Sequence, residues 1–320
     1  MFRSFSCLKS SIPHSPSLLK MSLSTKAGTV HPTSLNSFNS NHSLYDKVRP
    51  DFHKEFVAKF LVDLGLVKSD GSYDTDKKVL ELAAGTGKFT KNIVSLGWSR
   101  NDNLKIVEPS SGMLESFSKN FPDADARLGS SYDLPLEDDS VDAVIIAQGF
   151  HWFADKDSLK EIRRVLKPTG KLGMIWNFDS TENNGSLKRS KVDLKLTEEE
   201  LKQKEGWEKI AYLSQSKDQG VPQYRKGLWR DAFEDLNIFD SEAAINEFQH
   251  KIYPFDKTIV YDYWLSRSYI TSLPDDEKAK LKKQIEDTIE SLPDYSYADK
   301  DKKFLTQFLG SEYYVVSPIK

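Results

Sequence analysis

The central part of the chain alternates between short apolar runs and segments in which apolar residues have helical spacing. Short apolar runs bounded by turn residues predict strands that are buried on both faces of a sheet. The predicted strands are Val79–Leu82, Leu104–Glu108, a short strand at 127–129, Val141–Ala147 and 172–176. Between these strands, apolar residues recur every three or four positions, as on one face of a helix. This order predicts a parallel, doubly wound α/β sheet with helices on both faces.

Helical spacing also precedes the first predicted strand and follows the last one. Apolar residues predict a helix over 52–64 and another over 281–292. The aromatic residues of 261–272 lie on one face of a further predicted helix. Residues 313–316 predict the final strand, and 248–253 is another candidate strand.

The pattern divides the chain into four predicted parts. These parts are a tail at 1–42, a core that holds most of the sheet at 43–181, a polar cap or insertion with the substrate region at 182–270, and the final helix and strands at 271–320. The first 45 residues lack Asp and Glu and are rich in serine, which resembles a mitochondrial transit peptide. A disordered tail, or an extension upstream of a start at Met21, is the alternative. We expect a cytoplasmic protein, with a mitochondrial location as the alternative.

Composition and charge exclude several classes of protein. Lys and Arg number 45 against 48 Asp and Glu, so the net charge of -3 gives no reason to expect a nucleic-acid partner. Cys7 is the single cysteine, which excludes a disulfide within the chain and a cysteine metal cluster. No apolar run reaches the roughly 20 residues of a membrane span. We expect no bound metal, no membrane span and a monomer.

The turn after the first predicted strand carries the clearest candidate chemistry. Glu81 stands near the end of the strand, and Gly85 and Gly87 lie in the turn into the next helix. Glycines let the backbone approach a ligand closely, and the start of a helix presents free N–H groups to anions. A dinucleotide fingerprint fails because Thr90 replaces its third glycine, and a P-loop fails because Leu82 replaces its first. An ordinary tight turn is the alternative.

The end of the second predicted strand supports a nucleoside site. Glu108 lies about 20 residues beyond the glycine turn, where an acid can accept hydrogen bonds from both hydroxyls of a ribose. Pro109 and Met113 follow it and could flank an adenine. A turn proline and a core methionine are the alternatives for those two residues.

Several segments together resemble one family. Residues 81–87 resemble the first motif of class I S-adenosylmethionine-dependent methyltransferases, with Ala83 in the place of the usual first glycine. Residues 147–153, with their His-Trp pair, and 161–171 resemble the type 11 group of that class. Together with 45–50, they are similar to proteins of the trans-aconitate methyltransferase kind. The resemblance covers 43–178 well and 225–316 loosely.

The resemblance implies a Rossmann-like sheet of seven strands whose last strand, 313–316, is antiparallel. It implies S-adenosylmethionine as cofactor, S-adenosylhomocysteine as product and methyl transfer to a small molecule. We expect the acceptor to be the carboxylate of an organic acid, which is ionised near neutral pH and needs no base. A protein substrate is one alternative. A non-catalytic donor-binding scaffold is another, because Ala83 and Ser130 depart from the family pattern.

Candidate site residues follow from the motifs and the resemblance. The predicted donor-binding residues are Tyr45, Arg49, Glu81, Ala83, Gly85, Gly87, Glu108, Pro109, Met113, Ser130, Ser131, Tyr132 and Gln148. The predicted substrate residues are His151, Trp152, Trp176, Asn177 and Arg267. His151 is also the candidate general base, with a structural role as the alternative. Arg267 is expected to hold a substrate carboxylate or to form a surface salt bridge.

Overall fold

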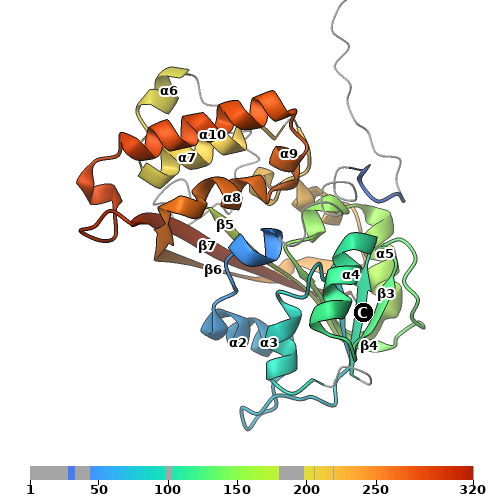
Figure 1. Cartoon of the computed structure of the whole chain (residues 1–320). Helices are drawn as coiled ribbons and strands as arrows, with labels where there is room; N and C mark the ends of the chain where they lie inside the picture. The colour runs from blue at the N-terminus through green and yellow to red at the C-terminus, as the bar shows by residue number, and fades with distance from the viewer. Residues whose placement is uncertain are drawn as a thin grey trace, which may run out of the picture.

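Seven strands form one sheet in the computed structural model, within the described residues 28–32, 44–98, 103–179, 198–204, 206–218 and 220–319. Their spatial order is β3-β2-β1-β4-β5-β7-β6. Figure 1 shows β5, β7 and β6 next to one another. The strands are β1 Val79–Leu82, β2 Leu104–Glu108, β3 Asp125–Leu128, β4 Val141–Ala147, β5 Leu166–Asp179, β6 Phe239–Asp256 and β7 Phe304–Pro318.

The strand directions confirm the predicted fold class. Strands β1 to β5 pair in parallel, whereas β7 runs antiparallel to both β5 and β6. The segment 313–316 lies within β7, as predicted, and 248–253 lies within β6. Parallel strands bring their carboxyl ends to one edge of the sheet, where ligands bind in folds of this kind.

Helices cover both faces of the sheet. Phe60 of α2, Ile93 of α3 and Phe117 of α4 join one apolar core. Ile162 of α5 and Trp229 of the 3-10 turn η3 join the core on the opposite face. The helices around the sheet are α2 Lys54–Asp63, α3 Thr90–Ser95, α4 Ser111–Asn120 and α5 Lys156–Val165. The 3-10 turns are η1 Phe150–Trp152, η2 Tyr224–Lys226, η3 Leu228–Phe233, η4 Lys257–Ile259 and η5 Asp294–Ser296.

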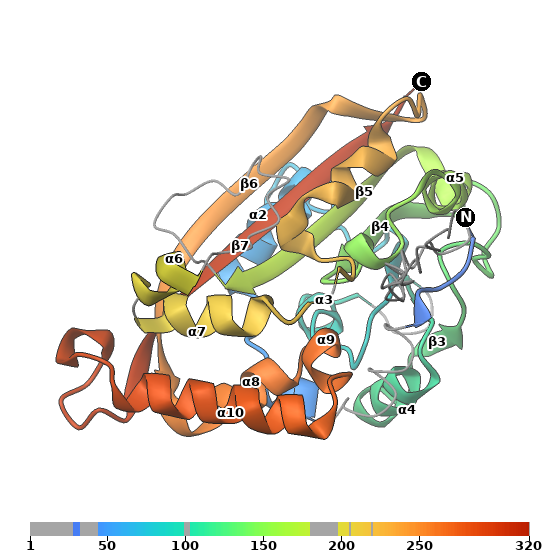
Figure 2. The same ribbon diagram turned by 90° about the horizontal axis from the view of Figure 1, so that it is seen from above.

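A group of helices beyond the parallel strands forms a cap with its own apolar core. Trp207, Trp264, Leu281 and Ile285 are buried together in it. Figure 2 shows α7, α8 and α10 packed side by side there. The cap helices are α6 Glu198–Lys202, α7 Gly206–Gln215, α8 Val260–Leu265, α9 Ser268–Thr271 and α10 Asp275–Glu290. Within the described ranges, none of the helices is long and apolar enough to cross a membrane.

The helix predicted over 261–272 is interrupted, so that part of the prediction is wrong. The chain leaves helical geometry at Arg267, whose backbone is extended, and α8 and α9 are separate helices. Arg49 donates from Nε to the hydroxyl of Ser266 over 2.8 Å, and Arg267 pairs with the buried carboxylate of Asp179 at the end of β5. These contacts direct the side chains of Ser266 and Arg267 toward the interior of the protein. Arg267 is therefore not in a surface salt bridge.

Candidate active site

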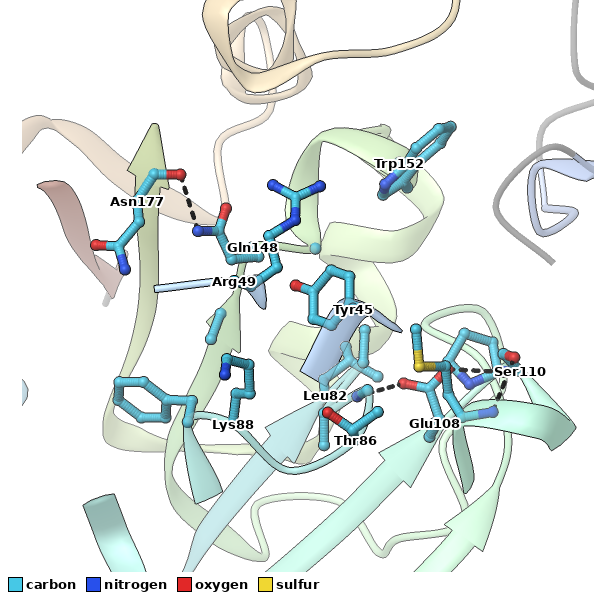
Figure 3. Close-up of a pocket in the computed structure, with 18 of the residues that line it drawn as sticks. Tyr45, Arg49, Leu82, Thr86, Lys88, Glu108, Ser110, Gln148, Trp152 and Asn177 are labelled. Carbon is cyan, nitrogen blue, oxygen red and sulfur yellow. Dashed lines mark hydrogen bonds between the residues drawn. The ribbon is translucent and has the colours of Figure 1, made fainter. Parts of the chain in front are cut away.

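A pocket lies at the carboxyl ends of β1, β2 and β4, where the predicted glycine turn enters α3. We call it the loop pocket. Its wall includes ten of the predicted donor-binding residues: Tyr45, Arg49, Ala83, Gly85, Glu108, Pro109, Met113, Ser130, Ser131 and Gln148. In Figure 3, Glu108 and Ser110 lie on one side of this pocket and Gln148 and Asn177 on the other, with Tyr45 and Arg49 between them.

Two tight turns meet at the floor of the loop pocket. Ala83 and Gln148 both have positive φ, 59° and 63°, a conformation that costs energy for residues other than glycine. A Cβ added to Gly149 would lie 3.2 Å from the Cβ of Ala83, so the two turns are in close contact. A Cβ added to Gly85, in contrast, would meet no atom within 4 Å. The backbone at Gly85 is therefore accessible to a ligand.

Glu108 ties β2 to the glycine turn. Its two carboxylate oxygens accept hydrogen bonds from the N–H groups of Gly85 and Ser110, each over 2.8 Å. Burial raises the pKa of Glu108 to about 7, although these two bonds oppose the rise. A carboxylate has about four acceptor positions, so Glu108 retains capacity for two hydroxyl donors.

Three predicted donor-binding residues lie outside the wall of the loop pocket. Glu81 is fully buried beneath the turn, where its Oε2 accepts a bond from the Thr90 hydroxyl over 2.7 Å and burial raises its pKa to about 8. Gly87 packs against Phe121, with no room for a Cβ. The Tyr132 hydroxyl donates to Asp155 over 2.6 Å. These residues form the frame of the pocket.

A second pocket adjoins the loop pocket, and we call it the arginine pocket. Five residues line both: Tyr45, Arg49, Gln148, Trp152 and Asn177. The predicted substrate residues His151 and Arg267 also line the arginine pocket, whereas Trp176 lies in the core. Trp176 is connected to the site through His151, because its indole Nε1 donates to Nδ1 of His151 over 3.4 Å.

Positive charge dominates the arginine pocket. Among the described residues, its wall holds three arginines, Arg49, Arg225 and Arg267, and one carboxylate, Asp179. Asp179 pairs with Arg267. Arg225 pairs with Asp218, which lies behind the wall. The ammonium of Lys226 also contacts the carboxylate of Asp218, at 3.1 Å.

Arg49 has no ion pair among the described residues, and its Nε donates to the neutral hydroxyl of Ser266. The sequence prediction missed Arg225 and Asp179. Arg225 lies in a polar region without periodic spacing, and Asp179 ends a strand that extends beyond its apolar run.

The N-terminal segment also reaches the loop pocket. Val30 forms part of its wall, and the buried ring of His31 packs against Trp152 with 5.4 Å between ring centroids.

The residues of the loop pocket fit a nucleoside-containing methyl donor. Glu108 suits ribose hydroxyls, and Pro109 and Met113 offer apolar surface to a base. The hydroxyl of Ser131 is buried beside the pocket and has no hydrogen-bond partner among the described residues. A buried polar group without a partner favours a ligand that supplies one.

Comparisons with known proteins show the family to which the chain belongs. The model of a methyltransferase domain matches residues 80–174. An uncharacterized methyltransferase of Schizosaccharomyces pombe is 31% identical over 277 residues, 86% of this chain and 96% of the relative. A methyltransferase-like protein of the same yeast is 29% identical over 274 residues, 84% of this chain and 91% of that protein.

A solved structure from Anaeromyxobacter dehalogenans, assigned to the type II methyltransferases, has a TM-score of 0.50 and 14% identity. It covers 84% of this chain and 97% of its own, which shows a shared fold. This chain belongs to the class I S-adenosylmethionine-dependent methyltransferases. It is therefore an enzyme whose cofactor is S-adenosylmethionine. The similarity to trans-aconitate methyltransferases stays a prediction.

Proposed function

We propose that this enzyme methylates a carboxylate oxygen of a small organic acid and so forms a methyl ester. The observation that supports the proposal is the excess of positive charge in the arginine pocket. Arg49 has no ion pair among the described residues, and Asp218 is shared by Arg225 and Lys226. Two positive charges therefore remain for bound anions, because buried charges are stable when they are paired.

Two anions are expected at these charges. The amino-acid carboxylate of the donor is the first, and Arg49 is the residue that lines both pockets and can pair with it. An acid bound beside Arg225 is the second. When bound, S-adenosylmethionine supplies a methyl group on a sulfonium, and transfer to a carboxylate oxygen breaks the C–S bond without moving a proton. The chain then needs to bind and orient the donor and the acid and to exclude water.

The loop pocket residues have separate roles in this proposal. Glu108 accepts hydrogen bonds from the ribose hydroxyls, and Pro109 and Met113 flank the adenine. Ser130 and Ser131 contact the edge of the adenine. Gln148 donates to the backbone carbonyl of Asn177 over 2.8 Å, a bond that holds the border between the two pockets in place.

A product assay tests the proposal. The enzyme is incubated with methyl-labelled donor and, in separate reactions, succinate, fumarate, citrate or benzoate. We expect label in an organic product that releases labelled methanol in alkali, because methyl esters hydrolyse there and methyl amines do not. Label that survives alkali, or no label from any acid, would contradict a carboxylate acceptor.

Two substitutions of Arg225 test whether the acid binds beside this residue. We expect Arg225→Met to lower kcat/KM for the methylated acid by about tenfold or more, the value of a charge-assisted hydrogen bond. Arg225→Lys, which keeps the charge, should lose less, and both variants should bind S-adenosylhomocysteine as the wild type does. Arg127→Met is the matched control, because Arg127 pairs with Asp125 on β3 and lines neither pocket.

A further inference from the structure

The two ring nitrogens of His151 have different surroundings. Nδ1 accepts a hydrogen bond from the indole N–H of Trp176. Trp176 is fully buried, and its ring packs against both Tyr224 and Trp229 at centroid distances of 4.9 and 4.7 Å. The direction of its N–H is therefore fixed. An indole N–H can only donate, so Nδ1 of His151 carries a lone pair and the proton of the neutral ring is on Nε2.

The other nitrogen is available to a ligand. Nε2 of His151 makes no hydrogen bond with the described residues, and the residue as a whole is half-buried. His151 lines the arginine pocket, whereas Trp176, which binds Nδ1, lies in the core. Since the two nitrogens of an imidazole point in divergent directions, Nε2–H is directed away from the core toward the pocket.

This arrangement does not suit a general base. A base must present a lone pair to the proton it removes, and the nitrogen on the pocket side already carries a proton. The charges around the ring also oppose protonation, because Arg49, Arg225 and Arg267 line the same pocket and Asp179 is the one carboxylate that the described part of the chain adds to it. Burial, and to a smaller extent Arg225, lower the pKa of His151 to about 3. The ring therefore stays neutral near pH 7.

We propose that His151 binds the methyl acceptor as a neutral hydrogen-bond donor through Nε2–H, and that Trp176 is the positioning residue that fixes this tautomer. The inference rests on the proposed carboxylate acceptor, because a carboxylate oxygen accepts a hydrogen bond and needs no base. It also predicts that the enzyme discriminates between carboxylate and amine acceptors. An ammonium group, which can only donate, would leave Nε2–H unpaired, and a site built to bond one partner rejects a group that cannot form that bond.

The tautomer can be observed without any acceptor. The protein is labelled with ¹⁵N-histidine, and the signals of His151 are identified among those of the six histidines by their loss in His151→Gln. We expect a protonated Nε2 and an unprotonated Nδ1 that do not titrate between about pH 5.5 and 8. Trp176→Phe should give a mixture of tautomers.

Trp98→Phe is the matched control for the loss of an indole N–H. Trp98 is a buried residue that donates to the carbonyl of Lys77 over 3.0 Å and lines neither pocket. It should leave the signals of His151 unchanged. A proton on Nδ1 in the wild type, or an unchanged tautomer in Trp176→Phe, would overturn the proposal.

Kinetics with each acid of the panel that is methylated separate a donor from a base. Gln keeps an N–H donor near the position of Nε2 but cannot act as a base. We therefore expect His151→Ala to lose about tenfold in kcat/KM and His151→Gln to keep most of it, with unchanged pH profiles. Equal losses in both variants, together with loss of a wild-type pH inflection, would assign His151 as a base and overturn the proposal.

The two proposals fail in distinguishable ways. A protonated Nδ1 overturns the role of His151 even if acids are methylated. A protonated Nε2 together with no methylation of any acid contradicts the carboxylate acceptor alone.

Discussion

Ala83 occupies a backbone conformation that suits glycine better. Its φ is 59°, and the neighbouring Gly149 leaves it just enough space. The sequence already marked Ala83 as a departure from the family pattern. The structure gives that departure a physical cost, because a residue with a Cβ is strained at this angle.

Replacing Ala83 by glycine should therefore stabilise the protein. We expect Ala83→Gly to raise the free energy of unfolding by about 0.5–1 kcal/mol, as strain relief outweighs the added freedom of the unfolded chain. Chemical denaturation measures this value. Ala84→Gly, one residue further and without a positive φ, is the control and should destabilise. Similar destabilisation by both changes would show that Ala83 is not strained.

Some residues of the site could be predicted from the sequence and others could not. Glu108 was predictable because a carboxylate that ends an apolar strand, at a fixed spacing from a glycine turn, needs a partner. Trp176 and Asn177 were not separable, since adjacent strand residues face opposite sides of a sheet and the sequence does not say which side holds the pocket. The structure places Trp176 in the core and Asn177 in the pocket wall.

The break between α8 and α9 depends on contacts between distant elements. Asp179 on β5 accepts hydrogen bonds from Trp207 of α7 over 3.1 Å and from Tyr263 of α8, and it pairs with Arg267. The helical spacing of apolar residues was correct on both sides of the break. No local signal marked the break itself, because its causes lie in other parts of the sequence.

Asp179 should accordingly be important for the stability of the cap. Asp179→Asn keeps the shape of the side chain but leaves the Arg267 guanidinium without its carboxylate. We expect the free energy of unfolding to fall by about 3–5 kcal/mol, the usual cost of breaking a buried ion pair from one side. Urea denaturation tests this. Asp157→Asn, which breaks an exposed pair with Lys160, should cost less than about 1 kcal/mol. Equal effects would contradict a special role for Asp179.

At the scale of the whole molecule, periodicity predicted the parallel strands and the helices between them, whereas the antiparallel last strand followed from the family resemblance. Alternating short apolar runs and helical segments allow few other topologies. The position of the cap over the carboxyl ends did not follow, because it depends on β6 and β7, whose 18 and 15 residues extend well beyond the segments predicted for them. The arginine pocket, which needs both the cap and the sheet, was therefore the least predictable part of the site.

Donor binding should couple to pH through Glu108. Its pKa of about 7 means that it carries a proton below pH 7 and is a carboxylate above it. Ribose hydroxyls prefer the carboxylate, so binding of S-adenosylhomocysteine should be about tenfold weaker at pH 6 than at pH 8 and should release a proton at pH 6. Calorimetry in buffers of different ionisation enthalpy measures both effects.

Glu108→Gln provides the control, because an amide does not titrate in this range. Its affinity should be low and nearly independent of pH, and the ligand should raise its melting temperature less than that of the wild type. A wild-type affinity that is constant from pH 6 to 8 would show that Glu108 does not bind the donor as a carboxylate.

One wall of the loop pocket comes from a segment far ahead of the sheet. Val30 lines the pocket and His31 packs on Trp152. A chain shortened from the N-terminus therefore keeps these contacts only if it retains both residues. Cleavage beyond residue 31 would open the pocket to water. An affinity tag at the N-terminus should therefore be joined so that Val30 and His31 are kept.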